Sequence, residues 1–308
     1  MKKWLILLIV ATVATSSCCT SKAQKSSPAA VVTAPISPGA DTLLVFSGKM
    51  GREIKNTVIL PARYFAPGDT THYPVVYLLH GAGGCYKDWP RVKSLPALAS
   101  EYGMIIVCPD GQDSWYFDSP IDPTMQFETY ITIELRQAVD NSYRTRHDRH
   151  GRAITGLSMG GHGALWLAWR HPDLYGACGS MSGGVDFTPW PRSWHLPDRL
   201  GPYAGNEALW RAHTVASLVP TLVDNRQQII IDDGDADFFY DVNIALHEAL
   251  TARGIAHKFD ILPGAHTWDY WARSVVLHLA FFDQCFKGKQ PSLDSHVMPK
   301  AVASKKAA

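Results

Sequence analysis

The stretch "GLSMGG", residues 156–161, surrounds one serine with small residues, and it decides the fold of the chain. It follows the strand-like "RAIT" and leads into the helix-like "GHGALWLAWR". Gly-x-Ser-x-Gly between a strand and a helix is typical of a sharp turn that presents a serine hydroxyl at the edge of a parallel sheet. Side chains at Gly156 and Gly160 would collide with the adjacent strand and helix. We therefore expect Ser158 to be a nucleophile rather than a serine that only caps a helix.

Around this turn the chain alternates between short β-branched runs and segments with helical periodicity. Apolar strands separated by helices predict a mostly parallel sheet with helices on both faces, an α/β architecture. The expected strands are 43–46, 57–60, 75–79, 104–107, 153–157, 177–181, 228–231 and 258–262, and the clearest expected helices are 126–143, 161–170, 239–253 and 268–286.

Two further features concern how the sheet begins and how its end is covered. The first two runs are joined by "SGKMGR", whose glycines predict an antiparallel hairpin at the start of the sheet. Residues 182–225 are rich in proline and tryptophan and weakly periodic, which favours an excursion over the end of the sheet rather than a second domain.

A serine nucleophile needs a base and an acid, which in this arrangement come later in the chain, the acid before the histidine. His266 lies in the loop "PGAHTW" between the strand "KFDIL" and the last helical segment, which makes it the expected base. His80, His162, His147 and His150 occupy a strand end, a helix or a charged loop and are weaker candidates.

The acid comes from the run "DDGDADFF", in which four aspartates fall within residues 232–237. Asp237 is the first choice and Asp235 the second. The Asp-x-Asp spacing also invites a calcium site, but the loop lacks the glutamate that would complete a twelve-residue calcium motif. We therefore expect no metal and no cofactor.

An acyl-transfer site also needs two backbone N–H groups for the oxyanion of the tetrahedral intermediate. One is expected from Met159, directly after the nucleophile, and the other from Ala82 in the glycine-rich turn after the third strand. A phosphate loop or a dinucleotide fingerprint would need Gly-Lys-Ser/Thr or the full Gly-x-Gly-x-x-Gly pattern, and the turn has neither.

Composition excludes other classes of function. The 29 basic and 28 acidic residues are intermixed, so the sequence has no basic patch for nucleic acid. Cys85, Cys108, Cys178 and Cys285 are scattered without metal-ligand spacing, and we expect no functional thiol among them.

The first residues, "MKKWLILLIVATVATSSCCTSKAQ", have two lysines and then an apolar run too short to span a bilayer, which is typical of an export signal. Cleavage after Ala23 and lipid attachment at Cys18 or Cys19 are both compatible with it. The expected organisation is a signal peptide at 1–23, a flexible linker at 24–40, a catalytic domain at 41–287 and a flexible tail at 288–308. The protein is expected to be periplasmic, cell-surface or extracellular.

Five blocks of sequence, in order, resemble one known family: "VVYLLHGAGGCYKDW", "VCPDGQDSWYFDSP", "GRAITGLSMGGHGAL", "IDDGDADFF" and "PGAHTWDYW". This family is the branch of the α/β-hydrolases that includes esterase D-like enzymes, feruloyl esterases and mycolyltransferases. The resemblance runs over about residues 41–286. It implies the α/β-hydrolase fold.

By motif position the resemblance implies Ser158 as the nucleophile, His266 as the base and the second aspartate of "GDAD", Asp237, as the acid. It also implies that "DGQDSWYFDSP" contributes to the acyl or alcohol pocket, through Asp113, Ser114 and Trp115. Packing of Trp115 within the loop is an equally open alternative.

The sequence therefore predicts an exported serine carboxylic ester hydrolase. Exported members of the family often act on plant cell wall esters, so the expected substrate is a feruloyl or acetyl ester linked to carbohydrate. Trp190, Trp194, Trp268 and Trp271 offer flat surfaces on which a sugar or an aromatic acid could stack. The alternatives are an acyltransferase, a small-ester hydrolase of the siderophore type and a non-catalytic carbohydrate-binding protein.

Overall fold

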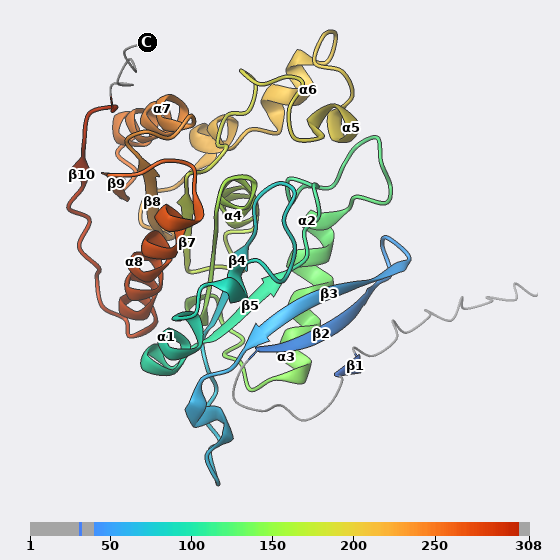
Figure 1. Ribbon diagram of the computed structural model, residues 1–308, viewed down its shortest axis with the longest axis vertical. Coiled ribbons are helices and arrows are strands. Elements are labelled where there is room, and N and C mark those ends of the chain that lie inside the picture. The colour runs from blue at the N-terminus through green and yellow to red at the C-terminus, as the bar shows by residue number, and fades with distance from the viewer. Residues whose placement is uncertain (1–30, 33–39, 302–308) are drawn as a thin grey trace, which may run out of the picture.

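The computed structural model describes residues 31–32 and 40–301 (Figure 1). The expected signal peptide, with Cys18 and Cys19, and most of the expected linker lie outside the described residues. In the described part of the chain no helix is long and apolar enough to cross a membrane.

One ten-stranded sheet organises the molecule, in the order β1-β2-β3-β5-β4-β6-β7-β8-β9-β10. The pairs from β1 to β5 along one side are antiparallel, and every pair from β5 to β10 is parallel. The strands are β1 (Val31–Val32), β2 (Ala40–Ser47), β3 (Arg52–Ile59), β4 (Val75–Leu79), β5 (Ile105–Pro109), β6 (Arg152–Gly156), β7 (Ala177–Met181), β8 (Gln228–Gly234), β9 (Lys258–Leu262) and β10 (His296–Val297).

The mostly parallel α/β sheet expected from the sequence is confirmed. The central strands β4, β5, β6 and β7 are buried along their whole length, as strands covered on both faces must be. The expected opening hairpin is also present, because β2 and β3 pair antiparallel across a turn that contains Gly51, whose φ is 68°.

Helices form a layer on each face of the sheet (Figure 1). On one face α1 and α8 pack over the central and late strands. The other face is covered by α4, α7 and the continuous helical segment that runs from α2 through α3. The helices are α1 (Leu95–Tyr102), α2 (Phe127–Thr129), η3 (Tyr130–Leu135), α3 (Arg136–Ser142), α4 (Met159–Arg170), α5 (Leu196–Leu200), α6 (Glu207–Ala212), α7 (Tyr240–Ala252) and α8 (Trp268–Phe286), with short turns η1 (Ala62–Phe65), η2 (Trp89–Arg91), η4 (Arg149–Gly151) and η5 (Val215–Thr221).

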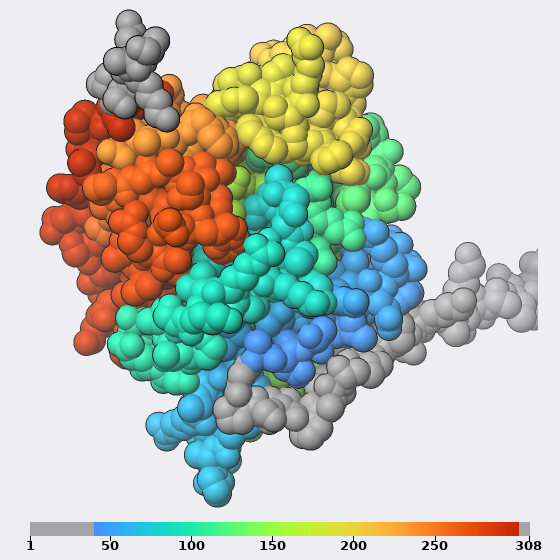
Figure 2. Space-filling model, in the orientation of Figure 1, coloured from blue at the N-terminus to red at the C-terminus, as the bar shows by residue number. Residues whose placement is uncertain are grey.

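The excursion at residues 182–225 contains α5, α6 and η5 and lies beyond one end of the sheet (Figure 1), and it forms the yellow surface at the top of Figure 2. The tail behaves differently from the flexible segment that the sequence suggests. Strand β10 pairs in parallel with β9, and the N–H of Ala301 donates to the carbonyl of Asp235. The described part of the tail therefore packs against the domain.

Candidate active site

Ser158 stands in a strained turn between β6 and α4. Its φ of 57° and ψ of −118° lie in a region that residues with a side chain rarely occupy. The surrounding structure holds it there, because its N–H donates to the carbonyl of Met181 and its own carbonyl accepts from His162. This conformation directs the hydroxyl away from the helix and into a cleft, whose lining includes Ser158.

The glycines on both sides of Ser158 are required by the close approach of β6, α4 and β4. A Cβ on Gly156 would lie 2.6 Å from backbone atoms of Gly160, and a Cβ on Gly160 would lie 2.5 Å from the carbonyl oxygen of Leu79. Those neighbours are backbone and cannot move aside cheaply. The steric demand expected from the sequence is confirmed.

Three side chains from separate loops meet at the end of the sheet. His266, between β9 and α8, places Nε2 2.9 Å from the Ser158 hydroxyl and Nδ1 2.8 Å from the carboxylate of Asp237. The other oxygen of Asp237 accepts from the N–H of Phe239 at 2.8 Å. The Asp237 side chain is fully buried, whereas that of His266 is 17% exposed. The imidazole is thus oriented by a buried carboxylate and faces the serine from the cleft.

The other aspartates of the acidic run have different partners. Asp235 accepts from the N–H of Gly264 at 2.9 Å, so it fixes the loop that carries His266 without touching the imidazole. Asp232 is buried next to α8 and accepts hydrogen bonds from Tyr270 and Ser274 of that helix. Asp233 is fully buried, and burial together with the neighbouring Asp237 raises the pKa of its carboxyl well above the usual range.

The two expected oxyanion donors flank the serine. Met159 is the first residue of α4, where backbone N–H groups have no acceptor within the helix. Ala82 lines the same cleft as Ser158. The turn around Ala82 is fixed by the next residue, because the N–H of Gly83 donates to the Asp113 carboxylate at 2.6 Å.

His80 fixes this turn through hydrogen bonds, a role that the sequence did not reveal. One ring nitrogen lies 2.7 Å from the carbonyl of Gly81, and the other accepts from the N–H of Gly111 at 2.8 Å. A histidine that uses one nitrogen as donor and the other as acceptor is neutral, with its tautomer fixed. His80 therefore couples the loop after β4 to the loop after β5.

Aromatic side chains surround His266 in a cleft of about 400 Å³. The ring of Phe238 lies 4.3 Å and that of Trp271 4.9 Å from the imidazole, between centroids. Trp268 also lines the cleft, as expected, and packs edge-on against Trp271. These rings exclude water from one side of the imidazole.

The expected substrate-binding residues of the loop after β5 do not all reach the cleft. Asp113 lines a second, adjoining cavity. Ser114 and Trp115 line neither space and are 0% and 1% exposed, so the expectation that they contact substrate is wrong. The Ser114 hydroxyl donates within its own loop to the carbonyl of Gly111, and Trp115 donates from its indole to the carbonyl of Trp194. Both side chains therefore have structural roles behind the residues that line the cleft and the adjoining cavity.

Two largely buried thiols are poor nucleophiles, and the described residues hold no cluster of metal ligands. Burial raises the pKa of Cys178 and of Cys285 to about 12, so neither is a thiolate near neutral pH. No three histidine, cysteine or acidic side chains in the described ranges are arranged to hold a metal ion.

Comparison with known proteins identifies the family. A family model described as "Putative esterase" matches residues 47–282, which is more than half of the chain. The chain belongs to this esterase family. Membership supports the hydrolysis of carboxylic esters, and the resemblance seen in the sequence motifs is confirmed.

Individual relatives span several activities. The chain is 34% identical to an esterase of Mycobacterium tuberculosis over 239 residues, which is 68% of this chain and 52% of that protein. It therefore spans about half the length of this relative. It is 27% identical to the diacylglycerol acyltransferase/mycolyltransferase Ag85B of Mycolicibacterium smegmatis, over 81% of this chain and 86% of that protein.

A solved structure agrees with the fold. A ferulic acid esterase superimposes with a TM-score of 0.70 at 27% identity and covers 80% of this chain and 98% of its own. The α/β-hydrolase fold expected from the sequence is thereby confirmed.

Proposed function

We propose that the protein is a serine esterase in which Ser158 is the nucleophile, His266 the base and Asp237 the orienting acid. The observation that carries this proposal is the unbroken chain of hydrogen bonds from the serine hydroxyl through the imidazole to the buried carboxylate. A serine hydroxyl is a weak nucleophile until an adjacent base takes its proton, and this chain supplies that base.

The mechanism follows from this geometry. The Ser158 oxygen attacks the ester carbonyl while Nε2 of His266 takes its proton, and the N–H groups of Ala82 and Met159 hold the oxyanion. His266 then gives the proton to the leaving alcohol, which departs and leaves an acyl-serine. A water activated by His266 attacks the acyl-serine, and the acid product leaves. Asp237 orients the imidazole throughout, and no cofactor takes part.

We propose feruloyl or acetyl esters of plant-type polysaccharides as the substrate. The aromatic rings around His266 suit a sugar or an aromatic acid, and the solved structure named above, at 27% identity, is a ferulic acid esterase. The export signal expected at residues 1–23, with or without a lipid at Cys18 or Cys19, would bring the enzyme to such polymers outside the cytoplasm.

Transfer of the acyl group to a sugar hydroxyl is the second candidate, since it uses the same acyl-serine and a relative carries a transferase name. Adding a sugar acceptor to the assay separates the two, because a transferase yields a new ester at the expense of free acid. A siderophore-type hydrolase would ignore feruloylated oligosaccharides, and a non-catalytic sugar-binding protein would cleave no ester.

The decisive experiment measures hydrolysis of methyl ferulate and p-nitrophenyl acetate by the described domain and by Ser158→Ala. The variant should lose on the order of 10⁶ in turnover. Ser292→Ala, at an exposed serine near the C-terminal end of the described residues, is the matched control and should retain full activity. Equal turnover by wild type and Ser158→Ala would refute the mechanism.

A further inference from the structure

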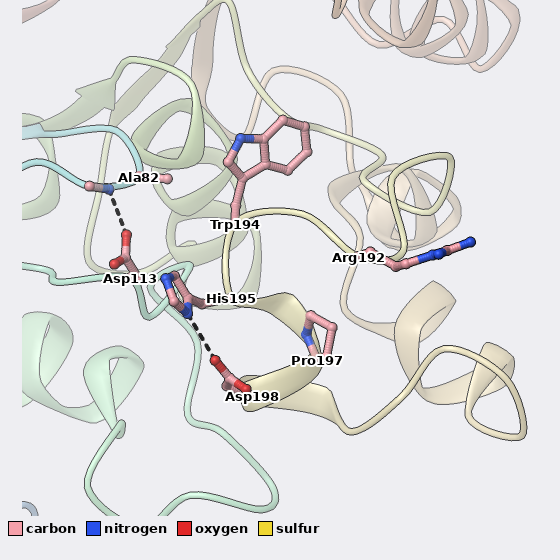
Figure 3. A pocket seen from close by; sticks show the side chains of 8 residues that line it. Ala82, Asp113, Arg192, Trp194, His195, Pro197 and Asp198 are labelled. Carbon is pink, nitrogen blue, oxygen red and sulfur yellow. Dashed lines mark hydrogen bonds and ion pairs between the residues drawn. The ribbon is translucent and has the colours of Figure 1, made fainter.

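Polar side chains near the catalytic residues differ in how firmly they are held. His195 and Asp198, in the wall of the cavity beside the cleft, are 62% and 61% exposed and form a surface pair (Figure 3). Asn243 of helix α7 is instead fully buried beside the acid loop, residues 235–239. Burying a polar group is costly unless it is hydrogen-bonded, so the partners of Asn243 indicate what this side chain holds together.

One hydrogen bond of the Asn243 amide reaches the loop that follows β7. Its Nδ2 donates to the carbonyl of Gly183 at 2.9 Å. The N–H of the next residue, Gly184, donates to the carbonyl of Ser158 at 3.2 Å, and the N–H of Ser158 donates to Met181 at the end of β7. Both backbone groups of the nucleophile are therefore held by the segment that Asn243 contacts.

The same amide also reaches the segment that carries the acid. Nδ2 of Asn243 donates to the carboxyl of Asp233 at 2.9 Å and lies 3.1 Å from the carbonyl of Phe239. An amide nitrogen has two hydrogens, so it can serve Gly183 and Asp233 at once. The N–H of Phe239 donates to the carboxylate of Asp237 at 2.8 Å. Asn243 thus lies against the residue that orients the proposed catalytic acid.

The loop after β7 is packed too tightly to absorb a displacement. A Cβ on Gly183 would overlap the hydroxyl of Ser180, and one on Gly184 would lie 2.9 Å from the ring of Trp115. Close-packed interiors transmit strain. A movement of Gly183 therefore reaches Ser158 through the bond from Gly184.

His266 bridges the two segments that Asn243 joins. Its ring nitrogens lie 2.9 Å from the hydroxyl of Ser158 and 2.8 Å from the carboxylate of Asp237. Because the imidazole has a fixed width, both contacts are made only within a narrow range of separations between the serine and the carboxylate. A displacement of about 1 Å in such a site can lower the rate about 100-fold.

We propose that Asn243 is a positioning residue for the triad. Its amide sets the separation between the loop beneath Ser158 and the loop that carries Asp237, so that His266 meets both at once. Asn243 itself touches no substrate and moves no proton. The inference rests on the proposed esterase mechanism, to which it adds a residue that acts only through the others.

The test compares two buried asparagines. Asn243→Ala should lower kcat for p-nitrophenyl acetate by about 10- to 100-fold, with an equal fall in kcat/KM, because the transition state loses alignment while substrate binding is untouched. Asn56→Ala, at an equally buried position on β3, is the matched control and should lose stability toward urea but keep its kcat. The Asn56 amide bonds to groups outside the triad loops, namely the carbonyls of Leu43 and Ile54 and the hydroxyl of Tyr130.

Asn243→Ser repeats the test with a gentler change. A serine within a helix can bond to the carbonyl four residues before it, here that of Phe239, so the variant keeps a satisfied polar group but loses both links. Its kcat should fall as in Asn243→Ala. Circular dichroism and urea unfolding on each preparation show that the measured kcat belongs to folded protein.

Wild-type kcat in folded Asn243→Ala or Asn243→Ser would overturn the inference. An equal loss of kcat in Asn56→Ala would do the same, since the effect would then be a general loosening of the fold. A rise in KM alone would place Asn243 in substrate binding and would also overturn it. In each case the wild type still cleaves ester and Ser158→Ala does not, so the mechanism stands. Equal ester cleavage by Ser158→Ala and wild type would instead refute the mechanism itself.

Discussion

Two histidine–aspartate pairs lie near the same end of the sheet, and only one of them faces a cleft. His266 with Asp237 and His278 with Asp232 both have an imidazole nitrogen 2.8 Å from a carboxylate oxygen. The His266 side chain is 17% exposed, whereas that of His278 is fully buried. The shared geometry shows that a histidine–carboxylate contact does not by itself make a catalytic site.

The second ring nitrogen separates the two pairs. In His266 it lies 2.9 Å from the hydroxyl of Ser158, in a strained turn at the cleft. In His278 it lies 2.8 Å from the hydroxyl of Thr155, inside strand β6. A base can act only where substrate and water reach it. The buried inner pair, His278 with Asp232, is accessible to neither.

The inner pair has a structural role that serves the outer one. Asp232 also accepts from Tyr270 at 2.7 Å and from Ser274 at 2.6 Å, both on helix α8. Every oxygen of this buried carboxylate is thus satisfied, and the network ties α8 to β6 and β8. Because α8 begins two residues after His266, the network also fixes where the catalytic loop ends.

The largest predicted effect separates the two histidines directly. His266→Ala removes the proposed base and should lower kcat for p-nitrophenyl acetate by on the order of 10⁶, as expected when one member of such a unit is lost. Steady-state assays and circular dichroism on the same preparation provide the measurement. A folded His266→Ala protein with kcat near wild type would contradict the role of His266 as the base. The pair at the cleft would then be no more catalytic than the buried pair.

The next effect distinguishes the aspartates. Asp237→Asn keeps the shape but removes the charge that orients His266, and kcat should fall by on the order of 10⁴. Asp235→Asn affects only the contact with Gly264 and should cost much less. The two amide variants are matched controls for each other. The reverse ranking would move the acid to Asp235.

The fold was predictable from the sequence where an element is long or buried on both faces. Val75–Leu79 and Trp268–Phe286 have the expected bounds, because an unbroken apolar run and a long helical period are both strong signals. Helix α1, at Leu95–Tyr102, was not predicted, since eight residues that include a proline show too little period. The pairing of β10 depends on a distant strand edge, which no local pattern reveals.

The site was predictable as far as chain order and loop position determine it. Ser158 and His266 follow from their places after strands, and the structure brings them together. Trp115 was misplaced because the direction of a loop side chain depends on its backbone, here with a φ of 58° that turns the ring inward. The contact between Asp232 and His278 joins residues 46 positions apart and leaves no trace in the sequence pattern.

The buried pair should instead affect stability. His278→Leu leaves Asp232 without its imidazole partner, and breaking a buried pair in this way costs about 3–5 kcal/mol. Urea unfolding measures the loss, while kcat of the folded variant should stay close to wild type. Thr155→Val removes only a hydroxyl and should cost about 1 kcal/mol. Loss of kcat in His278→Leu without loss of stability would assign the inner pair to the chemistry.

The smallest predicted effect concerns Asp233, a carboxyl between the two pairs. It accepts from the N–H of Gly234 and from the side chain of Asn243, and the carboxyl of Asp237 is close enough to act on it electrostatically. Burial and the charge of Asp237 raise its pKa well above the usual range. Asp237 must be charged to orient His266, so the proton resides on Asp233, because two adjacent buried carboxyls do not both ionise.

The sign of the pH dependence follows. Unfolded Asp233 ionises near pH 4, whereas the folded carboxyl keeps its proton, so its contribution to stability is complete below about pH 4 and is lost as pH rises toward the folded pKa. Asp233→Asn cannot ionise, so its free energy of unfolding should rise relative to wild type between pH 4 and 8. Asp241→Asn, at a carboxyl 73% exposed, should show no such trend.

The acid limb of the pH profile of kcat/KM gives an independent check. If Asp233 is neutral in the wild type, Asp233→Asn leaves this limb where it is. If Asp233 is charged, the substitution removes an anion from beside His266 and Asp237 and shifts the limb to lower pH.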